Sequence, residues 1–137
     1  MIEVALSLAI IVIIGTLAIP VYQSFQVRND LDIASNTITQ SLRRAQLLAQ
    51  TMEGDSNWGV KIQTSTITVF SGDNFSLRNQ TWDESFNLSP TITVQGLTEI
   101  VFNKFSGWPQ TSGTTTLIST INESRILVIN GRGSVNY

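Results

Sequence analysis

The side chains that could carry chemistry in this chain are few, and the most unusual is a carboxylate inside an apolar segment. The 137 residues contain no cysteine and no histidine, which excludes thiol nucleophiles, histidine relays and the common zinc ligand sets. The other acids form no recognisable catalytic pair, so we expect a protein that is not an enzyme, with no catalytic residue, metal or cofactor. Glu3 stands alone among the apolar side chains of MIEVALSLAIIVIIGTLAIP (1–20). A carboxylate in such surroundings is costly unless it is paired, so Glu3 indicates an ion pair.

The segment around Glu3 has the length and composition of a membrane span. Residues 4–22 carry no charge, and at a rise of about 1.5 Å each, roughly twenty residues cover the ~30 Å hydrocarbon core of a bilayer. The segment is apolar all round, which predicts a transmembrane helix. No basic residue precedes it and no small-residue cleavage site follows it. We therefore expect the segment to be retained, after removal of a basic leader upstream of Met1.

A second helical pattern continues beyond this segment. Its apolar residues recur every three or four positions: Val27, Leu31, Ala34, Ile38, Leu42, Ala45 and Ala49. This spacing predicts an amphipathic helix, and Gly54 is a stop signal. We expect one helix from about residue 2 to about residue 53, on the order of 80 Å long. Gly15 and Pro20 either mark a point where this helix bends or are simply tolerated, as they often are in membrane helices.

The rest of the chain is typical of a small β domain. Residues 72–90 are polar and lack a clear period, so they predict a long loop. Strand-like runs flank it at 58–63 and 66–71, in two parts of 91–105, and at 114–120, 124–130 and 134–137. The fold class predicted is α+β: a long N-terminal helix, transmembrane in its first half and amphipathic in its second, packed on a small antiparallel β-sheet head. Residues 1–26 would form the transmembrane and assembly helix, and 27–137 the head, with helix 27–53 and β domain 55–137.

The combination of these features resembles the type IV pilin superfamily. Its members share an apolar N-terminal helix with one glutamate near its start, as at Glu3, and a proline seventeen residues later, as at Pro20. In the family, Phe and a small polar residue usually precede the Leu/Met-Ile-Glu stretch, so Met1-Ile2-Glu3 resembles the tail of that pattern. The head is most similar to minor pseudopilins of type II secretion and related minor pilins, which have two small sheets behind the helix. The segments that carry this likeness are SLRRAQLLAQ (41–50), IVFNKFSGWP (100–109) and ILVINGRGSVNY (126–137).

The resemblance implies a structural subunit of a type IV pilus or a type II secretion pseudopilus. Glu3 would form the assembly salt bridge with the usually methylated N-terminal amine of a neighbouring subunit; the plain alternative is an interfacial cap on a membrane anchor. Implied partners are copies of itself or other pilins, the inner-membrane assembly platform, the prepilin peptidase and, before assembly, membrane lipid. The implied location is the cytoplasmic (inner) membrane, single-pass with the head outside, and then an extracellular pilus or periplasmic pseudopilus.

A second hypothesis belongs to a different class: a membrane-anchored, monomeric binding module that recognises DNA or a surface ligand through the head. Its candidate contacts are Trp82, Lys104, Arg125 and Arg132. DNA is not favoured, because phosphate binding usually needs several clustered cations. Packing within the loop or core is the favoured reading for Trp82.

Two further expectations concern the head. Trp58 and Trp108 adjoin strand signals and are expected in the core. Asp73, Asn74, Asp83 and Glu84 could offer oxygen ligands to calcium. Without EF-hand-like spacing, calcium is the lesser alternative.

Overall fold

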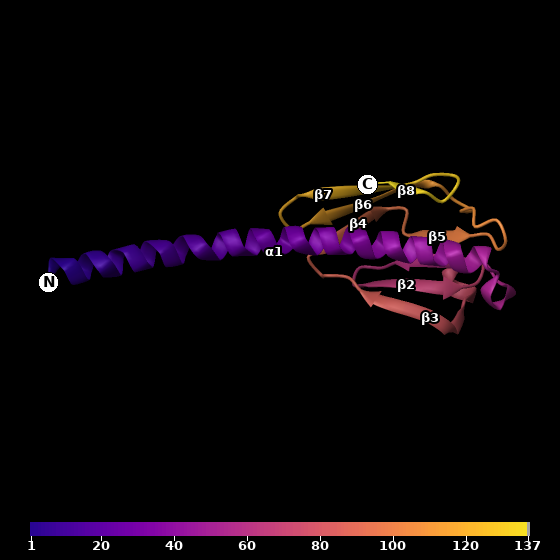
Figure 1. Ribbon diagram of the computed structural model, residues 1–137, viewed down its shortest axis with the longest axis horizontal. Coiled ribbons are helices and arrows are strands. Elements are labelled where there is room, and N and C mark those ends of the chain that lie inside the picture. The colour runs from indigo at the N-terminus through magenta and orange to yellow at the C-terminus, as the bar shows by residue number, and fades with distance from the viewer. Residues whose placement is uncertain (137) are drawn as a thin grey trace.

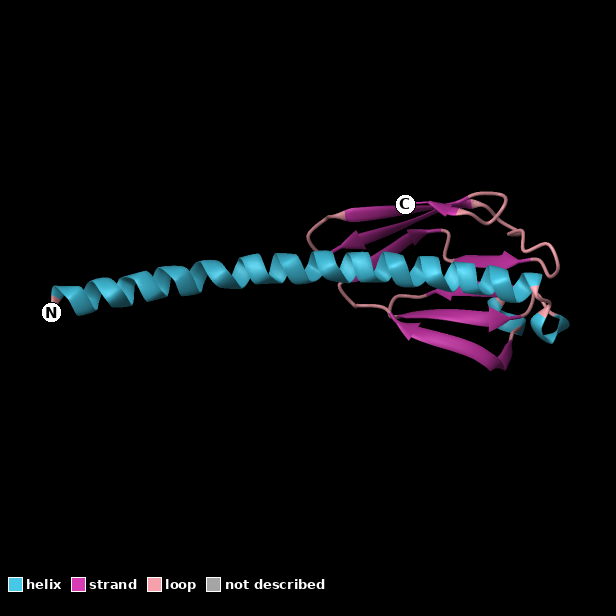
Figure 2. Cartoon of the chain, in the orientation of Figure 1, coloured by secondary structure: helices cyan, strands magenta, loops and turns pink. Residues whose placement is uncertain are grey.

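A single long helix dominates the structure. The computed structural model describes residues 1–136, apart from the side chains of residues 17–20. Helix α1 spans Ile2–Gln50. Figure 1 shows its N-terminal half projecting away from the head and its C-terminal half running along the head. All the strands lie around that second half (Figure 2). The predicted α+β fold is confirmed, with the helix ending three residues before the expected boundary.

The head consists of two four-stranded antiparallel sheets. In the first sheet, with order β3-β2-β1-β5, the strands are β1 (Trp58–Ile62), β2 (Thr66–Ser71), β3 (Asn79–Asn87) and β5 (Glu99–Phe102). In the second, with order β4-β6-β7-β8, they are β4 (Ile92–Gly96), β6 (Gly113–Ser119), β7 (Ser124–Ile129) and β8 (Val135–Asn136). Two 3-10 turns, η1 (Glu53–Asp55) and η2 (Phe75–Leu77), complete the fold. Consecutive strands pair through short hairpins in both sheets, as in β1–β2 and β6–β7.

The core lies between α1 and the inner faces of both sheets. Six of the seven residues in the apolar stripe are buried, namely Leu31, Ala34, Ile38, Leu42, Ala45 and Ala49. They belong to one cluster with side chains from the first sheet, such as Val60, and from the second, such as Leu117. The predicted packing of the amphipathic helix on the β head is therefore confirmed, and the structure shows that this helix joins two sheets. Val27 is only partly buried, because the head begins at its level.

The prediction of a long loop at 72–90 was wrong over Asn79–Asn87. These residues form β3, the edge strand of the first sheet, with Thr66 paired to Asn87 and Val69 to Glu84. Trp82, Glu84 and Phe86 share the side that faces α1, but Glu84 binds Arg44 instead of packing. The acid in this position breaks the alternation of apolar and polar residues that would have predicted a strand.

The two tryptophans that were expected in the core have different environments. Trp58 is buried, at 2% exposure, and its Nε1 donates to the Glu53 carbonyl at 2.9 Å. Trp108 is 59% exposed, so the expectation was wrong for this residue. The backbone on either side explains the difference, because Pro109 pairs with Phe102 while Trp108 points off the loop between β5 and β6.

Candidate functional site

The N-terminal half of α1 presents its side chains outward along its described length. Residues 1–16 are all exposed. The most apolar 18-residue window of α1 has a mean hydropathy of 2.7, so the helix is apolar enough and long enough to cross a membrane. The hydroxyls of Ser7 and Thr16 donate to the carbonyls of Glu3 and Ile13, at 2.8 and 2.9 Å. These bonds satisfy polar atoms within the helix, which lowers their cost in hydrocarbon.

Glu3 lies in the first turn of α1, at the positive end of the helix dipole. Within the described part of the chain its carboxylate forms no ion pair. Gly15 has open space around the position of a side chain. The side chain of Pro20 lies outside the described residues, so its role as a bend remains a prediction.

The level at which α1 leaves its apolar run is marked by two exposed aromatic residues and an ion pair. Tyr22 and Phe25 are exposed, and such aromatic side chains are typical of the interface between membrane and water. One turn further on, Arg28 Nε binds Glu123 Oε1 at 2.8 Å. The first charged residue after the apolar run is thus already tied to the head.

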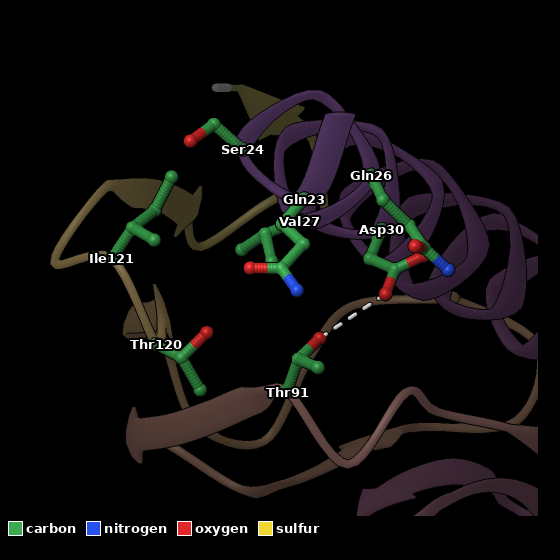
Figure 3. A pocket seen from close by; sticks show the side chains of 8 residues that line it. All are labelled: Gln23, Ser24, Gln26, Val27, Asp30, Thr91, Thr120 and Ile121. Carbon is green, nitrogen blue, oxygen red and sulfur yellow. Dashed lines mark hydrogen bonds between the residues drawn. The ribbon is translucent and has the colours of Figure 1, made fainter. Parts of the chain in front are cut away.

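A cleft of about 450 Å³ opens between α1 and the base of the head (Figure 3). It is lined by Gln23, Ser24, Gln26, Val27, Asp30, Thr91, Thr120 and Ile121. Asp30 Oδ2 accepts hydrogen bonds from Ser89 Oγ at 2.9 Å and from Thr91 Oγ1 at 3.2 Å. The helix and the β3–β4 connection are therefore joined at the wall of the cleft.

The opposite end of the head carries a well-anchored loop with exposed aromatic side chains. Phe105 N donates to the Ala49 carbonyl at 2.9 Å, which caps the end of α1. Phe105 adopts φ 72°, in the left-handed region, and its side chain is 77% exposed. Because the backbone is fixed while Phe105 and Trp108 stand in solvent, this loop presents a preorganised apolar surface.

The cationic candidates divide between the two ends of the head. Lys104 lies at the end beside the terminus of α1, where its Nζ binds Asp55 Oδ1 at 3.0 Å. Arg132 lies at the same end, because Gln46 Nε2 donates at 3.0 Å to its carbonyl and to that of Gly107. Arg125 is bound to Asp32 at 3.1 Å, towards the base of the head. The structure therefore brings Lys104 and Arg132 to one end and leaves Arg125 apart from them.

The remaining aromatic candidate, Trp82, lies on β3 and packs edge-on against Trp58, with ring centroids 6.1 Å apart. It is 43% exposed, so it is both a packing residue and a part of the surface. Beside it, the Arg44 guanidinium binds Glu84 through two hydrogen bonds of 2.5 Å. These bonds hold the pKa of the Glu84 carboxyl below its usual range and raise the pKa of Arg44.

The outer face of the first sheet contains a second charged network. Glu99 accepts hydrogen bonds from Lys61 Nζ and from the Phe75 backbone N–H, both at 3.0 Å. Burial alone would raise the pKa of Glu99, but these two bonds outweigh burial and hold it below its usual range. Arg78 stacks on the Phe75 ring, 3.8 Å from its centroid, and binds Asp83 at 2.8 Å.

The four residues considered as oxygen ligands for calcium each bind a separate partner. Asp73 accepts from Asn57 at 2.6 Å, and Asn74 caps η2 by accepting from Leu77 N at 2.9 Å. Asp83 and Glu84 are bound to Arg78 and Arg44. Among the residues that the structure describes, no three His, Cys, Asp or Glu side chains gather into a metal-binding group.

Two features of the surface were not found by sequence reasoning. The cleft at the base joins residues more than 60 positions apart, so no local pattern could reveal it. The exposed pair of Phe105 and Trp108 occurs in a segment, FSGWP (105–109), that has the glycine and proline of a turn. That turn signal could have suggested exposure for both aromatic residues.

The architecture is shared with a solved structure described as the minor pseudopilin EpsH from the Type 2 Secretion System of Vibrio cholerae. The two chains are 14% identical, the match covers 78% of this chain and 94% of that chain, and the TM-score is 0.56. No family profile and no curated protein matches the sequence. At this identity the likeness shows the fold alone: the chain has a type IV pilin-like fold, as the resemblance at its N-terminus predicted.

Proposed function

We propose that this chain is a pilin-like structural subunit of a type IV pilus or a type II secretion pseudopilus. The observation that carries the proposal is α1 itself. Its first half is apolar with a lone carboxylate near its start, and its second half is the core of the head. A helix of this kind can be held in a bilayer and later packed against identical helices. The likeness to a minor pseudopilin supports the same reading.

In this proposal Glu3 forms a salt bridge with the N-terminal amine of a neighbouring subunit. An ionised carboxylate costs roughly 2.5–3.5 kcal/mol in the middle of a membrane on insertion scales. Pairing in the interior of a helix bundle removes that cost and penalises neighbours packed out of register. The lack of an ion pair for Glu3 within the described residues supports a partner from another chain.

The other partners follow from the same assignment. Before assembly the subunit would lie in the cytoplasmic membrane with its head outside, in contact with lipid. The prepilin peptidase would process it and the inner-membrane assembly platform would add it to the filament. Its neighbours would be copies of itself or other pilins, in an extracellular pilus or a periplasmic pseudopilus.

The test compares Glu3→Ala with Ser7→Ala, which removes a polar group one turn further along α1 without removing a charge. Glu3→Ala should insert into the membrane normally, because loss of a charge favours partitioning into hydrocarbon. It should fail to co-purify with sheared filaments or with neighbouring pilins, since breaking a buried ion pair costs on the order of 3–5 kcal/mol. Ser7→Ala should assemble. Normal assembly of Glu3→Ala would make the carboxylate an interfacial cap and contradict the pairing.

A second function is favoured by one observation, the rigid loop that exposes Phe105 and Trp108 at the end of the head remote from the membrane helix. A monomeric, membrane-anchored binding module would use such a surface to contact a ligand. DNA is the weaker ligand class, because Lys104 and Arg125 are already bound to acids. Titration of the full chain in detergent with duplex DNA at low salt tests this version; absence of binding removes it.

A further inference from the structure

The cleft at the base of the head lies where α1 passes from its apolar run into the head. The apolar run ends at Tyr22, and the cleft is lined by helix residues from Gln23 onward. Opposite the helix, the cleft is closed by Thr91, Thr120 and Ile121 (Figure 3). Thr91 lies in the β3–β4 connection and the other two in the β6–β7 connection, at the end of the head from which the N-terminal half of α1 projects (Figure 1). The loop that carries Ile121 reaches the level of Ser24, since both residues line the same space.

Helix geometry places this level within the lipid headgroups. If the hydrocarbon core ends near Tyr22, then the helix residues that line the cleft, from Gln23 to Asp30, occupy the next ~12 Å at about 1.5 Å per residue. The headgroup layer on each side of a bilayer is roughly 5–7 Å thick, from a total of ~40–45 Å around a ~30 Å core. For a subunit anchored by this helix, the part of the cleft from Gln23 to Val27 therefore lies in the headgroup layer. The Asp30 backbone lies about 5 Å above that layer, and its side chain points back towards the N-terminus of the helix and so towards the headgroups.

The charges around the cleft favour a cationic group. Asp30 is the one charged residue among the described residues that line the cleft. Its Oδ2 is held by two hydroxyls, and its Oδ1 has no hydrogen-bond partner within the described chain. The nearest cation along the helix, Arg28, is bound to Glu123. An anionic headgroup would meet a carboxylate here, whereas an ammonium would gain a charge-assisted hydrogen bond.

We propose that this cleft binds the headgroup of a phosphatidylethanolamine-type lipid, an inference that rests on the membrane anchoring in the proposed function. The primary ammonium donates to Asp30. The amides of Gln23 and Gln26 and the hydroxyl of Thr120 are donors suited to the phosphate oxygens. The side chain of Ile121, at the tip of its loop, contacts the glycerol and upper acyl region. A choline headgroup carries the same charge but no N–H, so it cannot make the bond to Asp30.

Lipid selectivity is tested with the full chain in nanodiscs that contain equal amounts of ethanolamine, choline and glycerol phospholipids. Native mass spectrometry then records which lipid stays bound to the protein after the protein is released from the nanodisc. The wild type should retain the ethanolamine lipid, and Asp30→Asn, which keeps an acceptor for Ser89 and Thr91, should lower that preference about tenfold. Asp32→Asn is the matched control, because Asp32 is a carboxylate on the same helix that binds Arg125 outside the cleft. No preference in the wild type, or an equal loss in both variants, would overturn the proposal.

The position of the cleft is tested by depth measurement, which the absence of cysteine makes simple. A fluorophore is attached to single cysteines in Val12→Cys, Ile121→Cys and Phe105→Cys, and nitroxides are placed in the headgroups or deep in the acyl chains. We expect deep quenching at residue 12, headgroup quenching at residue 121 and none at residue 105, which lies beside Ala49, about 39 Å further along the helix than Gln23.

The same labels distinguish a failure of the lipid site from a failure of the membrane anchor. If residue 12 is quenched while residue 121 is as unquenched as residue 105, the head stands clear of the bilayer. The lipid site is then wrong and the membrane anchor stands. If residue 12 is not quenched either, the anchor itself fails and the lipid site fails with it.

Discussion

Replacement of Leu42 by alanine should destabilise the core that α1 forms with the two sheets. Leu42 is 1% exposed and belongs to the core cluster formed by α1 with both sheets. The change removes three carbon atoms, worth about 2.4 kcal/mol of transfer free energy at ~0.8 kcal/mol each, and leaves a cavity. The expected loss in unfolding free energy is about 3–4 kcal/mol. A domain of this size has a total of roughly 5–15 kcal/mol, so the loss should lower Tm by roughly 10–15 °C.

The same helix provides a matched control in Leu47→Ala. Leu47 is 57% exposed on the opposite side of α1, so the change of residue is identical and the helix propensity effect is the same. Thermal unfolding of the full chain in detergent, followed by near-UV circular dichroism of its aromatic side chains, should show a change of less than about 1 kcal/mol for Leu47→Ala. Equal losses for the two variants would refute the reasoning that the stripe through Leu42 is the core.

Two further predictions concern the first sheet. Gly59→Ala should lower Tm by a few degrees in the same assay, at a cost of about 1–3 kcal/mol. A Cβ there would lie 2.6 Å from Phe70 Cζ and 2.9 Å from the Ile100 carbonyl oxygen. An unchanged Tm would contradict this close packing. Because the pKa of Glu99 is held below its usual range, its ionised form stabilises the head above about pH 4.3 and this contribution is lost as the pH falls below that value. Glu99→Gln should therefore weaken the acid dependence of the unfolding free energy. An unaltered profile over roughly pH 3–6, the range around the ordinary pKa, would contradict the stabilising role of its bonds to the Phe75 N–H and to Lys61.

The helix and its buried face could be predicted because both depend on local periodicity. The residues from Leu31 to Ala49 recur at the spacing of one helix face, and that face is buried in the core. The division of the strands between two sheets came from the resemblance to minor pseudopilins and not from spacing. Strand spacing alone is compatible with one sheet or two.

The errors share a physical cause, because each concerns a residue whose environment is set by distant parts of the chain. The sequence indicates a loop at Glu84 because its partner in the folded chain, Arg44, lies forty positions earlier. Trp108 was expected in the core because it adjoins a strand signal. Its exposure follows instead from the pairing of Pro109 with Phe102 and from the anchoring of the Phe105 backbone to the end of α1. Side-chain type alone indicates neither contact.

The sequence and the structure point to different parts of the candidate site. Glu3 stands out in the sequence because it is a single acid in a charge-free run, and its role in pairing stays a prediction. The cleft does not stand out there, since Asp30 in isolation is an ordinary polar residue on a helix. It becomes a wall of the cleft only when the β3–β4 connection brings Ser89 and Thr91 to it.

The continuity of α1 bears on the choice between the two proposed functions. The apolar run ends at Tyr22 and the buried stripe begins by Leu31, within the same helix. Roughly 12–14 Å of helix separates them, and no glycine- or serine-rich linker intervenes. A tethered binding module gains reach from a flexible linker, whereas here the orientation of the head is fixed by the helix. When the helices of neighbouring subunits pack together, their heads must therefore take up defined positions around them. A rigid connection of this kind suits a subunit whose helix packing sets the geometry of a filament.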